Sequence, residues 1–266
     1  MDIYIMDTGK IGSFVAERLQ RVIHDKPSAL IGLTTGNTPV TTGIYRELVD
    51  REKQGLIDFR ECAFVNPDEQ VGISKSHPES YYAYMQHHFF DHIRHPEERR
   101  FIPDGSVVNP IEQCMKMEAF IHDFGGIDFQ LVGLGINGHI CFIEPASAIP
   151  ARSFVTPIAQ INRELYAKQF GSVEAVPTHA MTYGWVTVMN TRKLTLVAVG
   201  QSKSDIIATS ILGPITTEVP ATILQLHSNV EVVLDHAAAE ALESRMENLH
   251  TADINIVRIS DAITLN

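Results

Sequence analysis

The sequence is short of cysteine, of basic residues and of long apolar runs, and each shortage excludes a class of protein. Its three cysteines, Cys62, Cys114 and Cys141, are widely spaced and form no CxxC pair, so neither a disulfide framework nor a zinc site is indicated. Lys and Arg number 21 against 32 Asp and Glu, and the net charge of −11 argues against a nucleic-acid-binding face. No window approaches the roughly 18 apolar residues of a membrane span, and the N-terminus lacks a signal-peptide pattern. We therefore expect a cytoplasmic protein that binds neither nucleic acid nor membrane.

The composition that is present, 44% hydrophobic and 20% charged, is that of an ordinary globular protein. Helical periodicity from Gly12 to Ile23, again at Ile44 and Leu48, and again at Ile111, Met115 and Phe120 alternates with short apolar runs. These runs predict buried strands at 29–33, 62–65, 129–134, 194–199 and 230–234. The alternation predicts an α/β fold with a doubly wound, mostly parallel sheet and helices on both faces. Without a repeat or linker, a single domain over residues 1–266 is expected.

In such sheets ligands bind at the carboxyl ends of the strands, so the loops that follow the apolar runs are the places to look for chemistry. The first such loop is Thr35, Gly36, Asn37 and Thr38, with Pro39 placed to begin a helix. Backbone amides, threonine hydroxyls and a helix N-terminus together suit a phosphate. A tight turn with Thr38 as the helix cap is the alternative.

The second loop places two carboxylates, Asp68 and Glu69, directly after an apolar strand. A partly desolvated carboxylate in that position suits a base that removes a proton from carbon, whereas a solvated turn pair is the simpler alternative. The following Ser76-His77-Pro78-Glu79 is typical of a capping box and predicts a helix from residue 80 to residue 92.

The third loop, Gly133 to Pro145, is the most specific signal in the sequence. Its glycines match the GxGxxG pattern of a dinucleotide-binding site, but Pro145 follows too closely to leave room for the helix that such a site needs. His139 and Glu144, with Asn137 two residues before the histidine, could instead form a proton relay in which Glu144 orients the imidazole. A core histidine beside a loop glutamate is the alternative.

Two further features are weaker signals. His88 and His92 share a helical face, but the tract lacks the HExxH glutamate, so we expect no metal site. Lys203 follows another strand, where a cation could meet a phosphate, although a solvated lysine is the commoner case.

Taken in order, the motifs resemble those of the glucosamine-6-phosphate deaminase/isomerase family. They are TTGNTP, the acidic pair of NPDEQVG, HPESYYAYM, GLGINGHICFIEPAS, VPTHAMTYGWVT, VGQSK and LQLHSN, and the resemblance runs from about Leu30 to Asp235. It implies a phosphorylated amino sugar as substrate, conversion of glucosamine 6-phosphate to fructose 6-phosphate and ammonia, no cofactor, and a possible homo-oligomer.

The resemblance also implies roles for single residues. Asp68 would move a proton between C2 and C1, His139 would open the sugar ring with support from Glu144, and Asn137 stands where many members carry aspartate. The loop Thr35 to Thr38 and Lys203 would bind phosphate, with Lys168 near a position that is commonly arginine.

Three positions, Gln70, Asn137 and Ile143, depart from the family pattern and leave the sugar stereochemistry open. A galactosamine-6-phosphate isomerase/deaminase is therefore an alternative. A 6-phosphogluconolactonase-like hydrolase and a non-catalytic sugar-phosphate sensor are further alternatives, although the retention of Asp68, His139 and Glu144 together counts against a sensor.

Overall fold

The computed structural model describes residues 1–246 and 254–259. Its main sheet has eight strands in the order β11-β1-β10-β9-β6-β2-β3-β5, and every pairing is parallel. The strands are β1 (Asp2–Met6), β2 (Leu30–Gly32), β3 (Ala63–Val65), β5 (Arg100–Phe101), β6 (Phe129–Gly133), β9 (Leu194–Ala198), β10 (Val230–Leu234) and β11 (Asn255–Ile259). The five predicted strands are confirmed. The pattern missed β1, β5 and β11, because these are edge strands, very short strands or strands with polar residues interspersed.

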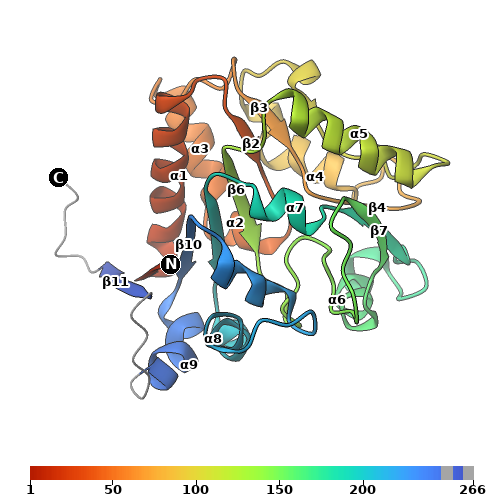
Figure 1. Ribbon diagram of the computed structural model, residues 1–266. Coiled ribbons are helices and arrows are strands. Elements are labelled where there is room, and N and C mark those ends of the chain that lie inside the picture. Colours follow the sequence, from red (N-terminus) through yellow and green to blue (C-terminus); the bar gives the residue numbers. More distant parts are fainter. Residues whose placement is uncertain (247–253, 260–266) are drawn as a thin grey trace.

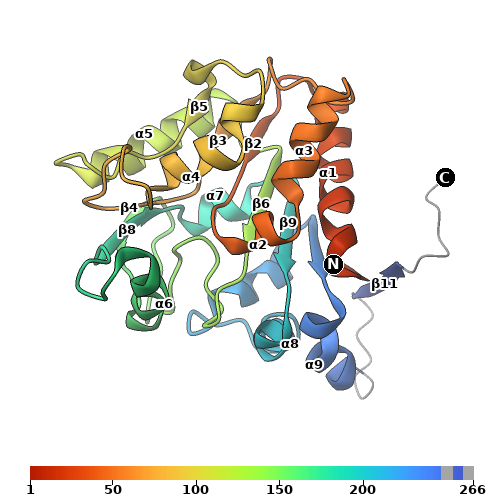
Figure 2. The same ribbon diagram turned by 180° about the vertical axis from the view of Figure 1, so that it is seen from behind.

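Helices cover both faces of the main sheet (Figures 1 and 2), which confirms the predicted doubly wound α/β fold. Alternate strand residues face opposite ways, as β1 shows: Ile3 and Ile5 pack into one core and Met6 into the other. One face is covered by α1 (Thr8–Asp25), α3 (Ile44–Lys53) and α4 (Tyr81–His88). The other is covered by α5 (Pro110–Asp123), α7 (Trp185–Met189), α8 (Ser204–Leu212) and α9 (His236–Met246).

Helix α5 lies where it was predicted but is rotated about its axis. Ile111 and Met115, which were expected to face the core, are 63% and 67% exposed, and Cys114, Met117 and Ile121 are buried instead. The helix begins after Asn109, whose side chain accepts a hydrogen bond from the Glu112 amide.

The predicted helix over residues 80–92 is shorter, and its predicted cap is wrong. Helix α4 ends at His88 and is followed by a 3₁₀ turn, η1 (Phe90–His92). Its N-cap is Ser80, whose hydroxyl accepts from the Ala83 amide, whereas Ser76 bonds to Ser74. The carboxylate that the predicted capping box would take from Glu79 comes instead from Glu69, which accepts hydrogen bonds from the first amides of α4.

A second, antiparallel sheet was not predicted. It consists of β4 (Glu69–Gln70), β8 (His179–Thr182) and β7 (Phe154–Pro157), in that order. Helix α6 (Gln160–Phe170) lies beside this sheet, as both views show (Figures 1 and 2). Phe142, Ile158 and Ala180 form a small separate core there, so this part of the molecule packs next to the main sheet with an interior of its own.

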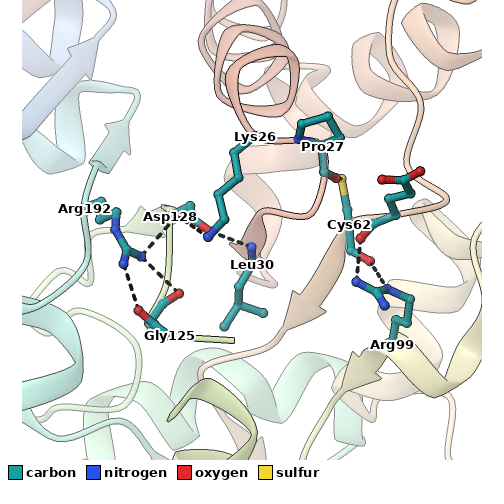
Figure 3. Close-up of polar contacts among 10 residues, drawn as sticks. Lys26, Pro27, Leu30, Cys62, Arg99, Gly125, Asp128 and Arg192 are labelled. Atoms are coloured by element: carbon teal, nitrogen blue, oxygen red, sulfur yellow. Dashed lines mark hydrogen bonds and ion pairs between the residues drawn. The ribbon is translucent and has the colours of Figure 1, made fainter. Parts of the chain in front are cut away.

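The amino ends of the central strands are held by a buried aspartate (Figure 3). Asp128, 6% exposed, accepts hydrogen bonds from the Leu30 amide at 2.9 Å, from Lys26 Nζ at 2.8 Å and from Arg192 Nη1 at 3.1 Å. These donors come from the end of α1, the start of β2 and the segment before β9. A carboxylate with this many donors is a structural tie, and it leaves the opposite edge of the sheet for chemistry.

Candidate active site

A cavity of about 800 Å³ lies at the carboxyl ends of β2, β3, β6 and β9. Strands β2 and β6 are neighbours in the sheet but not in the chain, so the cavity lies where the strand order reverses, the usual ligand site of such folds. The residues predicted from sequence that line it are Thr35, Gly36, Asn37, Thr38, Asp68, His139 and Lys203. The parallel sheet therefore brings all three predicted loops to one place.

Asp68 lies in the loop between β3 and β4 and is 4% exposed. Across the residues that the structure describes, its carboxylate accepts no hydrogen bond, and burial alone raises its pKa to about 8. A carboxylate without donors, in a cavity that admits a ligand, is a stronger base than an ordinary aspartate.

The neighbouring Glu69 has a different task. Its carboxylate accepts from the amides of Gln70 at 2.8 Å, Tyr81 at 2.8 Å and Tyr82 at 3.1 Å, so it ties β4 to the N-terminus of α4. Burial raises its pKa to about 8, although these three amides act in the opposite direction. Of the predicted acidic pair, only Asp68 lines the cavity.

His139, Asn137 and Glu144 form a connected set of hydrogen bonds. Asn137 Nδ2 donates to Glu144 Oε2 at 2.8 Å, which directs its Oδ1 toward His139 Nδ1, 2.7 Å away. Because Oδ1 can only accept, the Nδ1 of a neutral His139 carries the proton, and Nε2 is left as an acceptor. Burial lowers the pKa of His139, the charge of Glu144 raises it and that of Lys203 lowers it. Asn137 therefore bridges the imidazole and the carboxylate, whose nearest atoms, Nδ1 and Oε2, are 3.5 Å apart.

Asn162, which the sequence patterns did not indicate, completes this set. It lies in the first turn of α6 and donates from Nδ2 to Glu144 Oε1 at 2.6 Å, within 3.2 Å of His139 Nδ1. An asparagine in a polar helix, far along the chain from the glycine-rich loop, carries no local signal of this contact.

The loop after β2 enters the short helix α2 (Asn37–Thr41), whose N-cap is Gly36 and not Thr38. Gly36 has φ 104°, a conformation that favours glycine, and the next two residues, Asn37 and Thr38, line the cavity. Two tyrosines hold the loop: Tyr84, which also lines the cavity, donates its hydroxyl hydrogen to the Gly36 carbonyl at 2.6 Å, and Tyr45 donates to the Thr34 carbonyl. Both tyrosines were missed by the sequence patterns.

The two predicted lysines differ in position. Lys203 follows β9 in the 3₁₀ turn η3 (Gln201–Lys203), lines the cavity and donates from Nζ to the Leu134 carbonyl at 2.6 Å. Burial lowers its pKa. Lys168 is exposed on α6 and is not among the cavity-lining residues, so the structure gives its predicted phosphate contact no support. Gly200, at the start of η3, is anchored by the Asp235 carboxylate.

Several aromatic side chains contribute to the remaining walls of the cavity. Phe142 stacks parallel to Tyr81 and to His139, with centroids 6.0 Å and 6.5 Å away, and Tyr166 of α6 meets it edge-on. Gln70 and Cys141 also line the cavity, and Cys141 holds a left-handed φ of 54°. Ile143, the third departure from the family pattern, is buried in the main core.

His88 is the last residue of α4 and His92 lies in η1, so the two do not share a helical face; His92 Nε2 bonds to the His87 carbonyl, and His87 and His88 line the cavity. Over residues 1–246 and 254–259 no cluster of three His, Cys, Asp or Glu side chains has a metal-binding arrangement. In the same ranges, no helix is long and apolar enough to cross a membrane.

Comparison with known proteins gives consistent matches. The family model described as glucosamine-6-phosphate isomerases/6-phosphogluconolactonase matches residues 8–234. The chain is 40% identical to a glucosamine-6-phosphate deaminase of Thermoanaerobacter sp. strain X514 over 85% of this chain and 89% of that protein. It is 38% identical to one from Clostridium perfringens strain SM101 over 88% of this chain and 96% of that protein.

Solved structures show the same relationship. A monomeric glucosamine-6-phosphate deaminase superposes with a TM-score of 0.86 at 33% identity, covering 91% of this chain and all of the other. The 6-phosphogluconolactonase of Thermotoga maritima superposes with a TM-score of 0.71 at 14% identity over 88% of this chain and 99% of its own, which shows a shared fold alone. The chain therefore belongs to the glucosamine-6-phosphate isomerase/6-phosphogluconolactonase family.

Proposed function

We propose that the protein is an amino-sugar-phosphate isomerase and deaminase that converts glucosamine 6-phosphate to fructose 6-phosphate and ammonia. The observation that carries the proposal is the Asp68 carboxylate: it is buried, accepts no hydrogen bond from the described residues and shares a cavity with His139 and Lys203. A relative that is named glucosamine-6-phosphate deaminase and is 40% identical to this chain supports the same substrate.

In this proposal the phosphate lies at the loop formed by Thr35, Gly36, Asn37 and Thr38. The amides at the start of α2 and the threonine hydroxyls offer donors, and Lys203 offers a positive charge in the same cavity. A chain with a net charge of −11 needs such a local site to bind an anion.

Ring opening is assigned to His139. The neutral imidazole, with its proton on Nδ1, accepts the proton of the C1 hydroxyl at Nε2 and returns a proton to the ring oxygen as the C1–O bond to that oxygen breaks. Asn137 and Glu144 keep the ring in this tautomer, and the charge of Glu144 favours the transient imidazolium.

Isomerisation is assigned to Asp68. Its ionised carboxylate removes the C2 proton of the open-chain aldehyde and delivers it to C1, while one proton of the C2 amine passes to the C1 oxygen, which becomes a hydroxyl and leaves the nitrogen on C2 as an imine. Water adds to C2 and ammonia leaves, giving fructose 6-phosphate. Each step is a proton transfer or an addition to a carbonyl-like carbon, so positioning and acid-base catalysis supply the rate.

The test is to incubate the purified protein with glucosamine 6-phosphate, without added metal, and to measure both ammonium and fructose 6-phosphate. Equal amounts of the two products are expected. Galactosamine 6-phosphate and 6-phosphogluconolactone are assayed in parallel. A preference for the galacto sugar would reassign the substrate, lactone hydrolysis alone would favour the hydrolase alternative, and no turnover of any of the three would refute an enzymatic role in this class.

A further inference from the structure

Asn162 is an unusual residue in its helix. Within α6, which the structure describes completely, it is the one buried residue, at 2% exposed. A buried asparagine is unfavourable unless its amide is bonded. Its partner is Glu144, so the most buried contact of α6 is made to the proton relay and not to an apolar core.

The Glu144 carboxylate is held on both sides by asparagine amides. Asn162 Nδ2 donates to Oε1 at 2.6 Å and Asn137 Nδ2 donates to Oε2 at 2.8 Å, while the Ala159 amide is a long 3.4 Å from Oε1. The two short bonds fix the plane of the carboxylate. Without Asn162, Oε1 would keep only the long contact, Asn137 would be the single short donor left, and the carboxylate could turn Oε2 toward His139 Nδ1.

Such a turn would change the hydrogen-bond partner of the imidazole. In the structure Nδ1 is bonded to Asn137 Oδ1 at 2.7 Å, whereas Glu144 Oε2 is 3.5 Å away. We propose that Asn162 is a positioning residue: with Asn137, it holds Glu144 back from direct pairing with His139 and keeps the imidazole neutral, with its proton on Nδ1. The assignment of ring opening to His139 rests on the proposed function, whereas the positioning itself does not.

The charged groups around His139 allow a clear readout. Glu144 and Lys203 are the charges that act on it, in opposite directions, and Asp68 lies in the same cavity. Lys203 is not touched by a change at Asn162, because its Nζ is bonded to the Leu134 carbonyl. Asn162 Nδ2 also lies 3.2 Å from His139 Nδ1, so a change in the titration of His139 after substitution of Asn162 reports the position of Glu144 where that change is lost in a Glu144→Gln background.

The experiment compares Asn162→Leu, which keeps the branching at Cγ but has no amide, with Ile161→Ala, a matched control at an exposed neighbour in the same helix. His139 is titrated by NMR in the substrate-free proteins, and its signal is assigned from its loss in His139→Gln. In Asn162→Leu the midpoint is expected to rise by about one pH unit or more, as for an imidazole that gains a direct carboxylate partner. In Ile161→Ala it should stay at the wild-type value.

Activity gives the second readout. Asn162→Leu should lower kcat/KM for glucosamine 6-phosphate about 10- to 100-fold, the usual loss when an outer partner of a reacting group is removed. Its affinity for 2-amino-2-deoxyglucitol 6-phosphate, which cannot form a ring, should stay within about threefold of wild type because ring opening is not needed.

A folded Asn162→Leu protein whose His139 midpoint is unchanged would overturn the proposal. If that variant does not fold, Asn162→Ala is used: it removes the donor without adding a charge, and an unchanged midpoint there would also overturn the proposal. A shifted midpoint in a protein whose wild type releases no ammonium would support the positioning role while the proposed function fails, so the two can be told apart.

Discussion

One buried aspartate lies at the amino ends of the main-sheet strands (the amino edge) and another at their carboxyl ends (the carboxyl edge). The surroundings of the two carboxylates are opposite. Asp128 at the amino edge is 6% exposed and is bonded to Lys26, Arg192 and a backbone amide. Asp68 at the carboxyl edge is 4% exposed and accepts no hydrogen bond within the described ranges. Equal burial thus has two meanings: a paired carboxylate stabilises the fold, while an unpaired one costs stability and is retained for chemistry.

The largest expected effect comes from Asp68→Asn. Since asparagine cannot accept the C2 proton, kcat should fall by about 10²- to 10⁴-fold, the usual contribution of a general base. Stability should rise. The native carboxyl, with its pKa raised from 3.8 to about 8, loses stability as pH rises through that window, and asparagine does not.

Two measurements check this prediction: ammonium release, and thermal unfolding followed from about pH 4 to above pH 8. The gain in melting temperature should grow from pH 4 to pH 8 and then stay constant. A variant that loses activity and also becomes less stable at pH 8 would show that Asp68 is a structural residue like Asp128.

The pH dependence of the wild-type enzyme is the second prediction. Below the raised pKa of about 8, Asp68 is protonated and cannot act as a base, so kcat/KM should fall about tenfold for each pH unit below that value. His139 does not obscure this limb, because burial lowers its pKa away from this range. The residual activity of Asp68→Asn provides the control, since it should lack the same limb. A wild-type profile that is flat from pH 6 to 8 would contradict the base assignment.

Asp128→Asn makes the same substitution at the amino edge, where the opposite effect on stability is expected. It removes a charge whose cationic partners, Lys26 and Arg192, are 40% and 54% exposed, so the ion pairs are partly screened. The free energy of unfolding should drop by about 1–2 kcal/mol, mainly through weaker bonds to the buried carboxyl. Urea unfolding measures the drop, and kcat should stay within about twofold of wild type because the site lies at the opposite edge. A large loss of kcat would mean that the two edges are not independent.

The contrast between the edges also explains what sequence could predict. Strands β2, β3 and β6 are continuous apolar runs, and parallel strands bring their following loops together, so Asp68 and His139 could be placed in one site from sequence. The small sheet could not be predicted, because β4 is two residues long and β7 and β8 lack a continuous apolar run. Asn162 reaches Glu144 only through the packing of this sheet with α6.

The smallest effect is expected from Tyr84→Phe, which tests whether the carboxyl edge also needs hydrogen bonds for shape. The Tyr84 hydroxyl donates to the Gly36 carbonyl, at the residue whose left-handed backbone turns the chain into α2. Loss of one such bond is worth about 0.5–1.5 kcal/mol, so KM should rise about 2- to 12-fold. Because Asp68 and His139 are untouched, kcat should not change.

Tyr82→Phe is the matched control: its hydroxyl bonds to Glu97, and Tyr82 does not line the active-site cavity. Inhibition by inorganic phosphate, measured in both variants, should weaken in Tyr84→Phe alone. A fall in kcat with KM unchanged would instead place the Gly36 loop beside the reacting carbons and away from the phosphate.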